Sequence, residues 1–163
     1  MKSKTSKIVY FIVVLLFMLL FDLYFSNSIV NTLKFGTPFG EISHNRVFDL
    51  VYVTNTGAAF SILNQYPHLL TVIGFISVII CLYAVIKYTN KMSGMMLFWM
   101  GMLLAGISGN LYERIVYGYV RDFFDIKLFD FPVFNISDMF ISIGVICILF
   151  IMAKGYFRIR GKG

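Results

Sequence analysis

Charged side chains are scarce in this sequence. Only 13% of its 163 residues are Asp, Glu, Lys or Arg, whereas 59% are hydrophobic. Soluble globular domains usually contain about 25% charged and about 45–50% apolar residues. The shortage of charge therefore excludes a soluble cytosolic domain, a disordered chain and a nucleic-acid-binding protein. The net charge of +6 therefore needs an explanation other than the binding of nucleic acid.

Cysteines and metal-binding motifs are also scarce. The two cysteines, Cys81 and Cys147, lie within apolar runs and have neither a CxxC partner nor the spacing of zinc ligands. They fit small buried apolar side chains. No phosphate-binding loop is present. We therefore expect no metal and no cofactor. Because neither cysteine lies in a lipid-attachment motif, the protein is not expected to be a lipoprotein itself.

Four long apolar runs are present instead. A helix that crosses a bilayer needs about 20 residues. Three runs are long enough, and the fourth becomes long enough if residues 134–138 continue it. The predicted spans are 8–25, 69–86, 95–111 and 138–153, with outer segments 27–68 and 112–137. Without repeats or linkers, the chain 1–163 is predicted to form a single polytopic membrane domain.

The charges are sorted by sign between the two sides of this arrangement. One side carries nine basic residues and no acid: Lys2, Lys4, Lys7, Lys87, Lys91, Lys154, Arg158, Arg160 and Lys162. All eight acids lie on the other side or at its helix ends. The positive-inside rule therefore places both termini in the cytoplasm. A cleaved signal peptide is the alternative for the first span, but Asp22 interrupts it and its loss would leave three spans.

The outer segments contain enough polar sequence for small elements. Residues 47–53 are β-branched and aromatic, which predicts a strand, and Gly36, Pro38 and Gly40 indicate turns. Charged and apolar residues alternate over 122–131, which predicts a short amphipathic helix at the membrane interface. The predicted fold class is an all-α membrane protein with four transmembrane helices, a small extracytoplasmic β element and a short interfacial helix.

Acidic residues at membrane depth are costly and indicate a functional site. At 1.5 Å per residue, Asp22 and Asp138 lie about 22 and about 24 Å from the cytoplasmic end of their spans, with Asn110 at a similar level. Two carboxylates that share a site hold one proton between them and can activate water, as in aspartic proteases. Other acid–base groups are weaker candidates: His44 and His68 lie in outer loops, and Ser61 and Ser108 lack an activating partner.

Five polar motifs occur in order in this chain, and together they resemble those of the lipoprotein signal peptidase (signal peptidase II) family of bacterial intramembrane aspartic proteases. The first-span aspartate matches Asp22. The other four motifs match Asn55, Gly57, Ala58 and Phe60; Gly106, Gly109, Asn110 and Arg114; Val120, Asp122, Phe123 and Asp125; and Phe134, Asn135 and Asp138.

The resemblance implies a function and a set of site residues. The function is removal of the signal peptide from diacylglyceryl-modified prolipoproteins in the bacterial cell membrane, by a multi-pass protein that contacts membrane lipid and is expected to be a monomer. The catalytic aspartates would be Asp122 and Asp138. The resemblance alone selects Asp122 over Asp125. The residues that bind substrate or support the site would be Asp22, Asn55, Gly57, Asn110, Arg114 and Asn135.

Four positions depart from the family pattern: Leu23, Ser26, Glu113 and Ser137. Ser137 would add a hydroxyl beside the dyad, and Glu113 keeps the charge of the usual aspartate with a longer side chain. Several alternatives stay open. Asp138 could serve only as a helix N-cap, Asp22 could be purely structural, and Arg114 could pair with Glu113 or another carboxylate. A proton-coupled transporter and a non-enzymatic scaffold are the rival functions.

Overall fold

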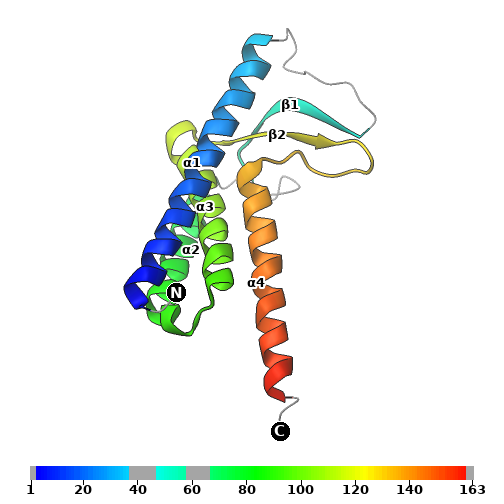
Figure 1. The fold of residues 1–163 in the computed structure, drawn as a ribbon. Coiled ribbons are helices and arrows are strands. Elements are labelled where there is room, and N and C mark those ends of the chain that lie inside the picture. The colour runs from blue at the N-terminus through cyan, green and yellow to red at the C-terminus, as the bar shows by residue number, and fades with distance from the viewer. Residues whose placement is uncertain (1–2, 37–46, 58–66, 161–163) are drawn as a thin grey trace.

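The computed structural model describes residues 3–36, 47–57 and 67–160. Its elements are, in order, α1 (Lys4–Gly36), β1 (Phe48–Asn55), α2 (Pro67–Tyr88), the 3₁₀ turn η2 (Thr89–Lys91), α3 (Gly94–Tyr117), β2 (Val120–Ile126) and α4 (Ile136–Arg160). Figure 1 shows both chain ends at one end of the helices and the sheet at the other.

Four helices are long and apolar enough to cross a membrane, which confirms the four predicted spans. The helices extend beyond the apolar runs, and α1 continues to Gly36, past residue 27 where the outer segment was predicted to begin. The polar residues that follow Phe25 are satisfied within the helix. Ser28 and Thr32 each donate a hydroxyl hydrogen bond to the carbonyl four residues earlier, both at 2.8 Å.

Helix α3 is the central element of the helical part. Helices α1, α2 and α4 all pack on it, and it is the most buried of the four. Glycines allow close approach at two of these contacts. A Cβ at Gly101 would meet the side chain of Val14 on α1, and Gly144 on α4 lies against Leu103. Helix α3 therefore fixes the positions of the other three long helices.

The sheet joins two outer segments that are far apart in the sequence. Strands β1 and β2 pair antiparallel, with Val53 opposite Asp122 and Asn55 opposite Val120, and an irregularity lies between Leu50 and Val53. The strand predicted at residues 47–53 is confirmed, but its partner comes from the second outer segment. Figure 1 shows the pair extending to one side of the helices.

The short interfacial helix predicted over residues 122–131 is wrong. The chain forms β2 from Val120 to Ile126 and then turns. Charged and apolar residues of this segment do not separate onto a wet and a dry face, because Arg121, Asp122 and Phe123 are all buried in the strand. Backbone hydrogen bonds between Phe124 and Phe134, at 2.9 and 3.1 Å, then fold the following segment back toward the start of α4.

Candidate active site

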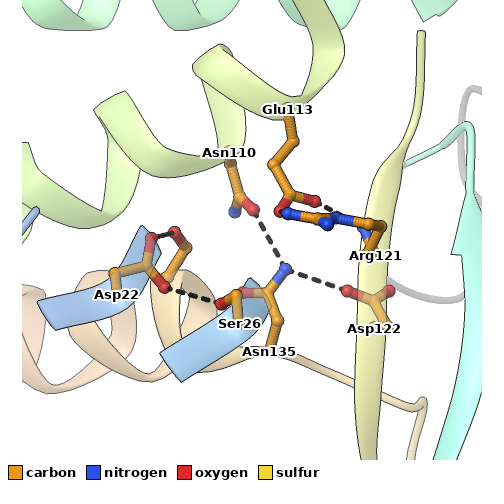
Figure 2. Close-up of polar contacts among 8 residues, drawn as sticks. Asp22, Ser26, Asn110, Glu113, Arg121, Asp122 and Asn135 are labelled. Atoms are coloured by element: carbon orange, nitrogen blue, oxygen red, sulfur yellow. Dashed lines mark hydrogen bonds and ion pairs between the residues drawn. The ribbon is translucent and has the colours of Figure 1, made fainter. Parts of the chain in front are cut away.

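The candidate site lies where α3, β2 and the first turn of α4 meet. Figure 2 shows Asp122 on β2 opposite Asn110 on α3, with Asn135 between them. Asp122 is only 1% exposed. Its Oδ2 accepts a hydrogen bond of 2.9 Å from the Asn55 side chain on β1, and its Oδ1 accepts one of 3.0 Å from the Asn135 amide. Two amide donors therefore fix both carboxylate oxygens.

Asp138 is the second carboxylate of the site. Its Oδ1 accepts a hydrogen bond of 2.7 Å from the Asn110 side chain. Its Oδ2 accepts from the backbone N–H of Asn135 at 3.3 Å, and its own N–H donates to Oδ1 of Asn135 at 2.9 Å. This reciprocal pair is a capping box in which Asn135 is the N-cap. The alternative that Asp138 itself is the N-cap is therefore wrong.

The two carboxylates are linked through a pair of amides. The Asn135 side chain, which donates to Asp122, also donates to Oδ1 of Asn110 at 3.1 Å, and Asn110 donates to Asp138. Each amide has one oxygen and one NH₂ group, and each therefore acts as both acceptor and donor here. The structure thus brings Asp122, Asp138, Asn55, Asn110 and Asn135 into one hydrogen-bond network.

The surroundings of Asp122 favour its protonated form. Burial raises the pKa of Asp122 to about 7; the negative charge of Asp138 also raises it, while the hydrogen bonds from Asn55 and Asn135 oppose the rise. Burial in a medium of low polarity penalises the ionised form of a carboxyl group. The site can therefore retain a proton near neutral pH, as acid–base work by a carboxylate pair requires.

Arg114 lies beside the network, but it does not pair with Glu113. Its guanidinium donates to the carbonyl of Gly57 at 3.0 Å and to that of Asn110 at 3.3 Å. Its buried Nε has no hydrogen-bond partner in the part of the chain that the structure describes. Glu113 instead forms an ion pair of 2.6 Å with Arg121. Arg114 therefore contributes a positive charge that no carboxylate of the described residues contacts directly.

Asp22 forms a separate polar cluster next to the dyad network. It is 3% exposed and accepts hydrogen bonds from Ser137 at 2.7 Å and from Ser26 at 3.3 Å. Gly109 packs against this cluster, since a Cβ there would overlap Asp22 and Ser137. The Ser137 hydroxyl is therefore directed to Asp22 and not to the dyad. Asp22 connects α1 to the start of α4.

A cavity of about 470 Å³ lies beside the network. Its polar wall includes Asp138 and Arg114. The rest is mostly apolar, and the complete lining is Asn55, Gly57, Asn110, Arg114, Val120, Ile126, Phe131, Pro132, Val133, Phe134, Asp138, Met139, Ile141, Ser142 and Ile143. Such a volume fits a ligand or a short peptide segment, with the carboxylate and amides at one wall to orient it.

Other candidates from the sequence lie elsewhere. His68 is exposed at the start of α2, and Ser108 is on α3. Four residues fall outside the described ranges: His44, Ala58, Phe60 and Ser61. Within residues 3–36, 47–57 and 67–160, no cluster of three or more His, Cys, Asp or Glu side chains is arranged to hold a metal ion.

The sequence did not indicate two contacts that support the site. These are the Glu113–Arg121 ion pair and the hydrogen bond from Ser137 to Asp22. Each contact includes one residue that departs from the family pattern, Glu113 or Ser137. Those departures were the only sequence signal for the contacts, because the pairing depends on how α3 leads into β2 and how α1 packs near α4.

Comparison with known proteins agrees with this geometry. A profile of the signal peptidase (SPase) II family matches residues 14–154. The chain is 38% identical over 108 residues to a lipoprotein signal peptidase of Caldicellulosiruptor bescii, which is 66% of this chain and 69% of that one. It is 43% identical over 103 residues to that of Cyanothece sp., and this match spans 63% of this chain and only 59% of the relative.

Two solved structures of bacterial membrane enzymes have the same fold. One superposes with a TM-score of 0.75 at 28% identity and covers 88% of this chain and 87% of the other. The second gives a TM-score of 0.72 at 30% identity, with 87% and 91% covered. The profile match includes the carboxylates of β2 and α4, and the four-helix arrangement is shared. The chain belongs to the signal peptidase II family.

Proposed function

We propose that this chain is an intramembrane aspartic endopeptidase that removes the signal peptide from diacylglyceryl-modified prolipoproteins, with Asp122 and Asp138 as its catalytic pair. Membership of the signal peptidase II family supports the peptidase activity. The observation that carries the assignment of the pair is the shared amide network. Asn135 and Asn110 link a carboxylate on β2 to a carboxylate on α4 beside an apolar cavity.

The pair would act on the scissile peptide bond through one water molecule. One ionised carboxylate takes a proton from the water while the water oxygen attacks the carbonyl carbon. The protonated partner hydrogen-bonds to the carbonyl oxygen as negative charge develops there, and a proton then passes to the leaving amine. The raised pKa of Asp122, which burial brings to about 7, supports a pair that still holds one proton at neutral pH.

The remaining site residues would hold the pair and the substrate. Asn55, Asn110 and Asn135 keep the carboxylate oxygens oriented. Arg114 is anchored by the carbonyl of Gly57. Its Nε–H has no partner among the described residues and would donate to a substrate carbonyl. Asp22 supports the start of α4 through Ser137. No cofactor takes part in this mechanism.

The cavity suggests how the substrate reaches the pair. Met139 and Ile143 line it and belong to α4, a membrane-spanning helix. A signal helix in the bilayer would therefore enter beside α4, with the lipid on its cysteine holding the scissile bond at the level of Asp138. Both chain ends lie away from the sheet (Figure 1), which with the basic ends supports cytoplasmic termini and an extracytoplasmic site. We propose that the enzyme acts as a monomer.

The decisive experiment compares aspartate variants on a lipid-modified prolipoprotein. Purified protein in detergent should release the signal peptide, and Asp122→Asn and Asp138→Asn should each lower kcat/KM by about 10²–10⁴-fold. The matched control is Asp125→Asn on the same strand, where the carboxylate pairs with Lys127 at 2.6 Å. It should cleave at nearly the normal rate.

Two results would overturn this assignment. If folded Asp122→Asn or Asp138→Asn cleaves at the normal rate, the pair is wrong, and a large loss in Asp125→Asn would transfer the role to that residue. If the folded unsubstituted protein does not cleave, a transporter or scaffold function is favoured, and ion flux across proteoliposomes would distinguish these two.

A further inference from the structure

A buried ion pair holds the residue that precedes Asp122. The carboxylate of Glu113 on α3 accepts hydrogen bonds from Nε of Arg121 at 2.9 Å and from its Nη2 at 2.6 Å. Its second oxygen accepts from the backbone N–H of Arg121 at 2.7 Å. The two side chains are 8% and 7% exposed. One carboxylate therefore holds both the backbone and the side chain of Arg121.

The local fold makes this contact possible. Helix α3 ends at Gly118, whose φ of 81° lies in the left-handed region, and its N–H bonds to the carbonyl of Arg114 at 3.1 Å. The chain reverses there, so β2 begins beside the last turns of α3. The guanidinium of Arg121 lies 4.4 Å from the ring centre of Tyr117. Glu113 and Tyr117 thus enclose the Arg121 side chain.

The charges around Asp122 make the balance of this pair important. The carboxylates that act on Asp122 are those of Asp138 on α4 and Glu113 on α3. The positive groups are Arg114 on α3 and Arg121 on β2. Asp22 on α1 interacts with Glu113 and Asp138, and the facing strand β1 contributes the neutral amide of Asn55. Unpaired, Glu113 or Arg121 would add a net charge beside the dyad.

We propose that Glu113 and Arg121 form a positioning clamp that sets the place of Asp122 and keeps the charge next to the dyad balanced. The clamp rests on the proposed catalytic role of Asp122. Because Glu113 binds the backbone N–H of Arg121, it fixes the peptide that leads into Asp122. Because Arg121 neutralises its charge, Glu113 raises the pKa of Asp122 less than burial and the charge of Asp138 do. For Arg121 itself, burial lowers its pKa, but the hydrogen bonds that it donates to Glu113 and the negative charge of Glu113 together outweigh this, and the pKa is raised.

The test separates the charge of the clamp from its shape. Glu113→Gln keeps the acceptor oxygen but leaves Arg121 as an unpaired cation next to Asp122. An added positive charge favours the ionised carboxylate. Cleavage of a lipid-modified prolipoprotein should decline at high pH, where the pair loses its shared proton. In Glu113→Gln this decline should occur about one pH unit lower. The double variant Glu113→Gln with Arg121→Met removes both charges and should restore the pH of that decline.

The positional part of the clamp has its own readout. Glu113→Asp keeps the charge but shortens the side chain by one methylene, so kcat should fall by about tenfold while KM and the pH of the decline stay near normal. The matched control is Lys127→Met. It removes one positive charge from the far end of the same sheet, where Lys127 pairs with Asp125 and Asp49. This variant should change neither kcat nor the pH profile.

Specific outcomes would overturn the clamp without affecting the proposed function. A folded, active Glu113→Gln variant with an unchanged pH profile removes the role of charge balance. Failure of the double variant to restore the profile does the same, and normal kcat in Glu113→Asp removes the positional role. If Glu113→Gln does not fold, Arg121→Met decides the electrostatic part: it leaves Glu113 as an unpaired anion and should move the decline to higher pH, and an unchanged profile overturns the charge balance. Loss of the catalytic pair itself is detected independently by Asp122→Asn.

Discussion

At the scale of single residues, the site contains carboxylates in three different roles. Asp22 accepts only hydroxyl groups among its described partners, and Glu113 is neutralised by Arg121. Asp122 and Asp138 are instead held by neutral amides. A neutral amide orients a carboxylate and favours its ionised form less strongly than a paired cation does. The amides therefore leave the pair free to exchange a proton.

The burial of Asp122 predicts how stability depends on pH. Its pKa of about 7 in the folded protein, raised by burial from 3.8, means that the folded state binds the proton more tightly than the unfolded state. The free energy of unfolding should therefore fall as pH rises from about 4 to about 7, by up to roughly 1.4 kcal/mol per unit of pKa difference. Thermal unfolding in detergent across this range measures it.

The Asp122→Asn variant should remove the part of this dependence that Asp122 contributes, because its side chain does not titrate. Asp125→Asn removes a carboxylate from the same strand and serves as the control, and it should keep the slope of the unsubstituted protein. An equal slope in Asp122→Asn and in the unsubstituted protein would show that another group is responsible.

At the scale of elements, the first turn of α4 contains residues that both cap the helix and form part of the site. Asn135 caps this helix through its reciprocal hydrogen bonds with Asp138, and the same side chain donates to Asp122 and Asn110. The capping box therefore places Asp138 next to Asn135, the residue that contacts Asp122, its proposed catalytic partner. A cap that also bridges the two carboxylates differs from an ordinary helix start.

This difference can be tested with two cap variants. Asn135→Ala and Ser93→Ala each remove an N-cap, that of α4 and that of α3, where Ser93 accepts from Met96 at 3.1 Å. Each should lower stability by about 1 kcal/mol. Only Asn135→Ala should also lower kcat, by about tenfold or more, because it removes a donor to Asp122. Unfolding curves and cleavage rates measure both effects, and equal kcat losses in the two variants would contradict a special role of Asn135.

The helices were predictable from the sequence, but their ends and the second strand were not. The length of an apolar run indicates directly whether a helix can cross the bilayer, so all four spans were predicted. The end of α1 was missed because Ser28 and Thr32 bond to the helix backbone instead of ending it. The segment of β2 was mistaken for a helix because seven residues are too few to separate the two periodicities.

At the scale of the whole molecule, the site is assembled from strands β1 and β2, which helices α2 and α3 separate in the sequence, and from the helices α3 and α4. Pairing of β1 with β2 brings Asn55 to Asp122 across 67 positions, and Asn110 meets Asp138 across 28. The resemblance named these residues, but single-sequence reasoning from spacing had no means to select Asp122 over Asp125. The choice depends on the strand register, because Asp122 lies opposite Val53 near α3 whereas Asp125 lies opposite Asp49 at the far end.

The distribution of charge over the whole molecule predicts its orientation in the membrane. The described basic residues Lys4, Lys7, Lys87, Lys91, Lys154, Arg158 and Arg160 belong to the start of α1, the α2–α3 connection and the end of α4, away from the sheet (Figure 1), and no described acid lies there. Such residues are retained in the cytoplasm. In a variant with Cys81→Ala and Cys147→Ala, a new cysteine by Leu128→Cys should react with a membrane-impermeant maleimide on intact spheroplasts, since Leu128 is exposed beyond β2. A cysteine by Gly155→Cys, where the added side chain meets no atom within 4 Å, should react only after the membrane is permeabilised. Labelling of Gly155→Cys on intact spheroplasts would reverse the orientation and place the proposed catalytic pair on the cytoplasmic side, where the proposed substrate does not present its cleavage site.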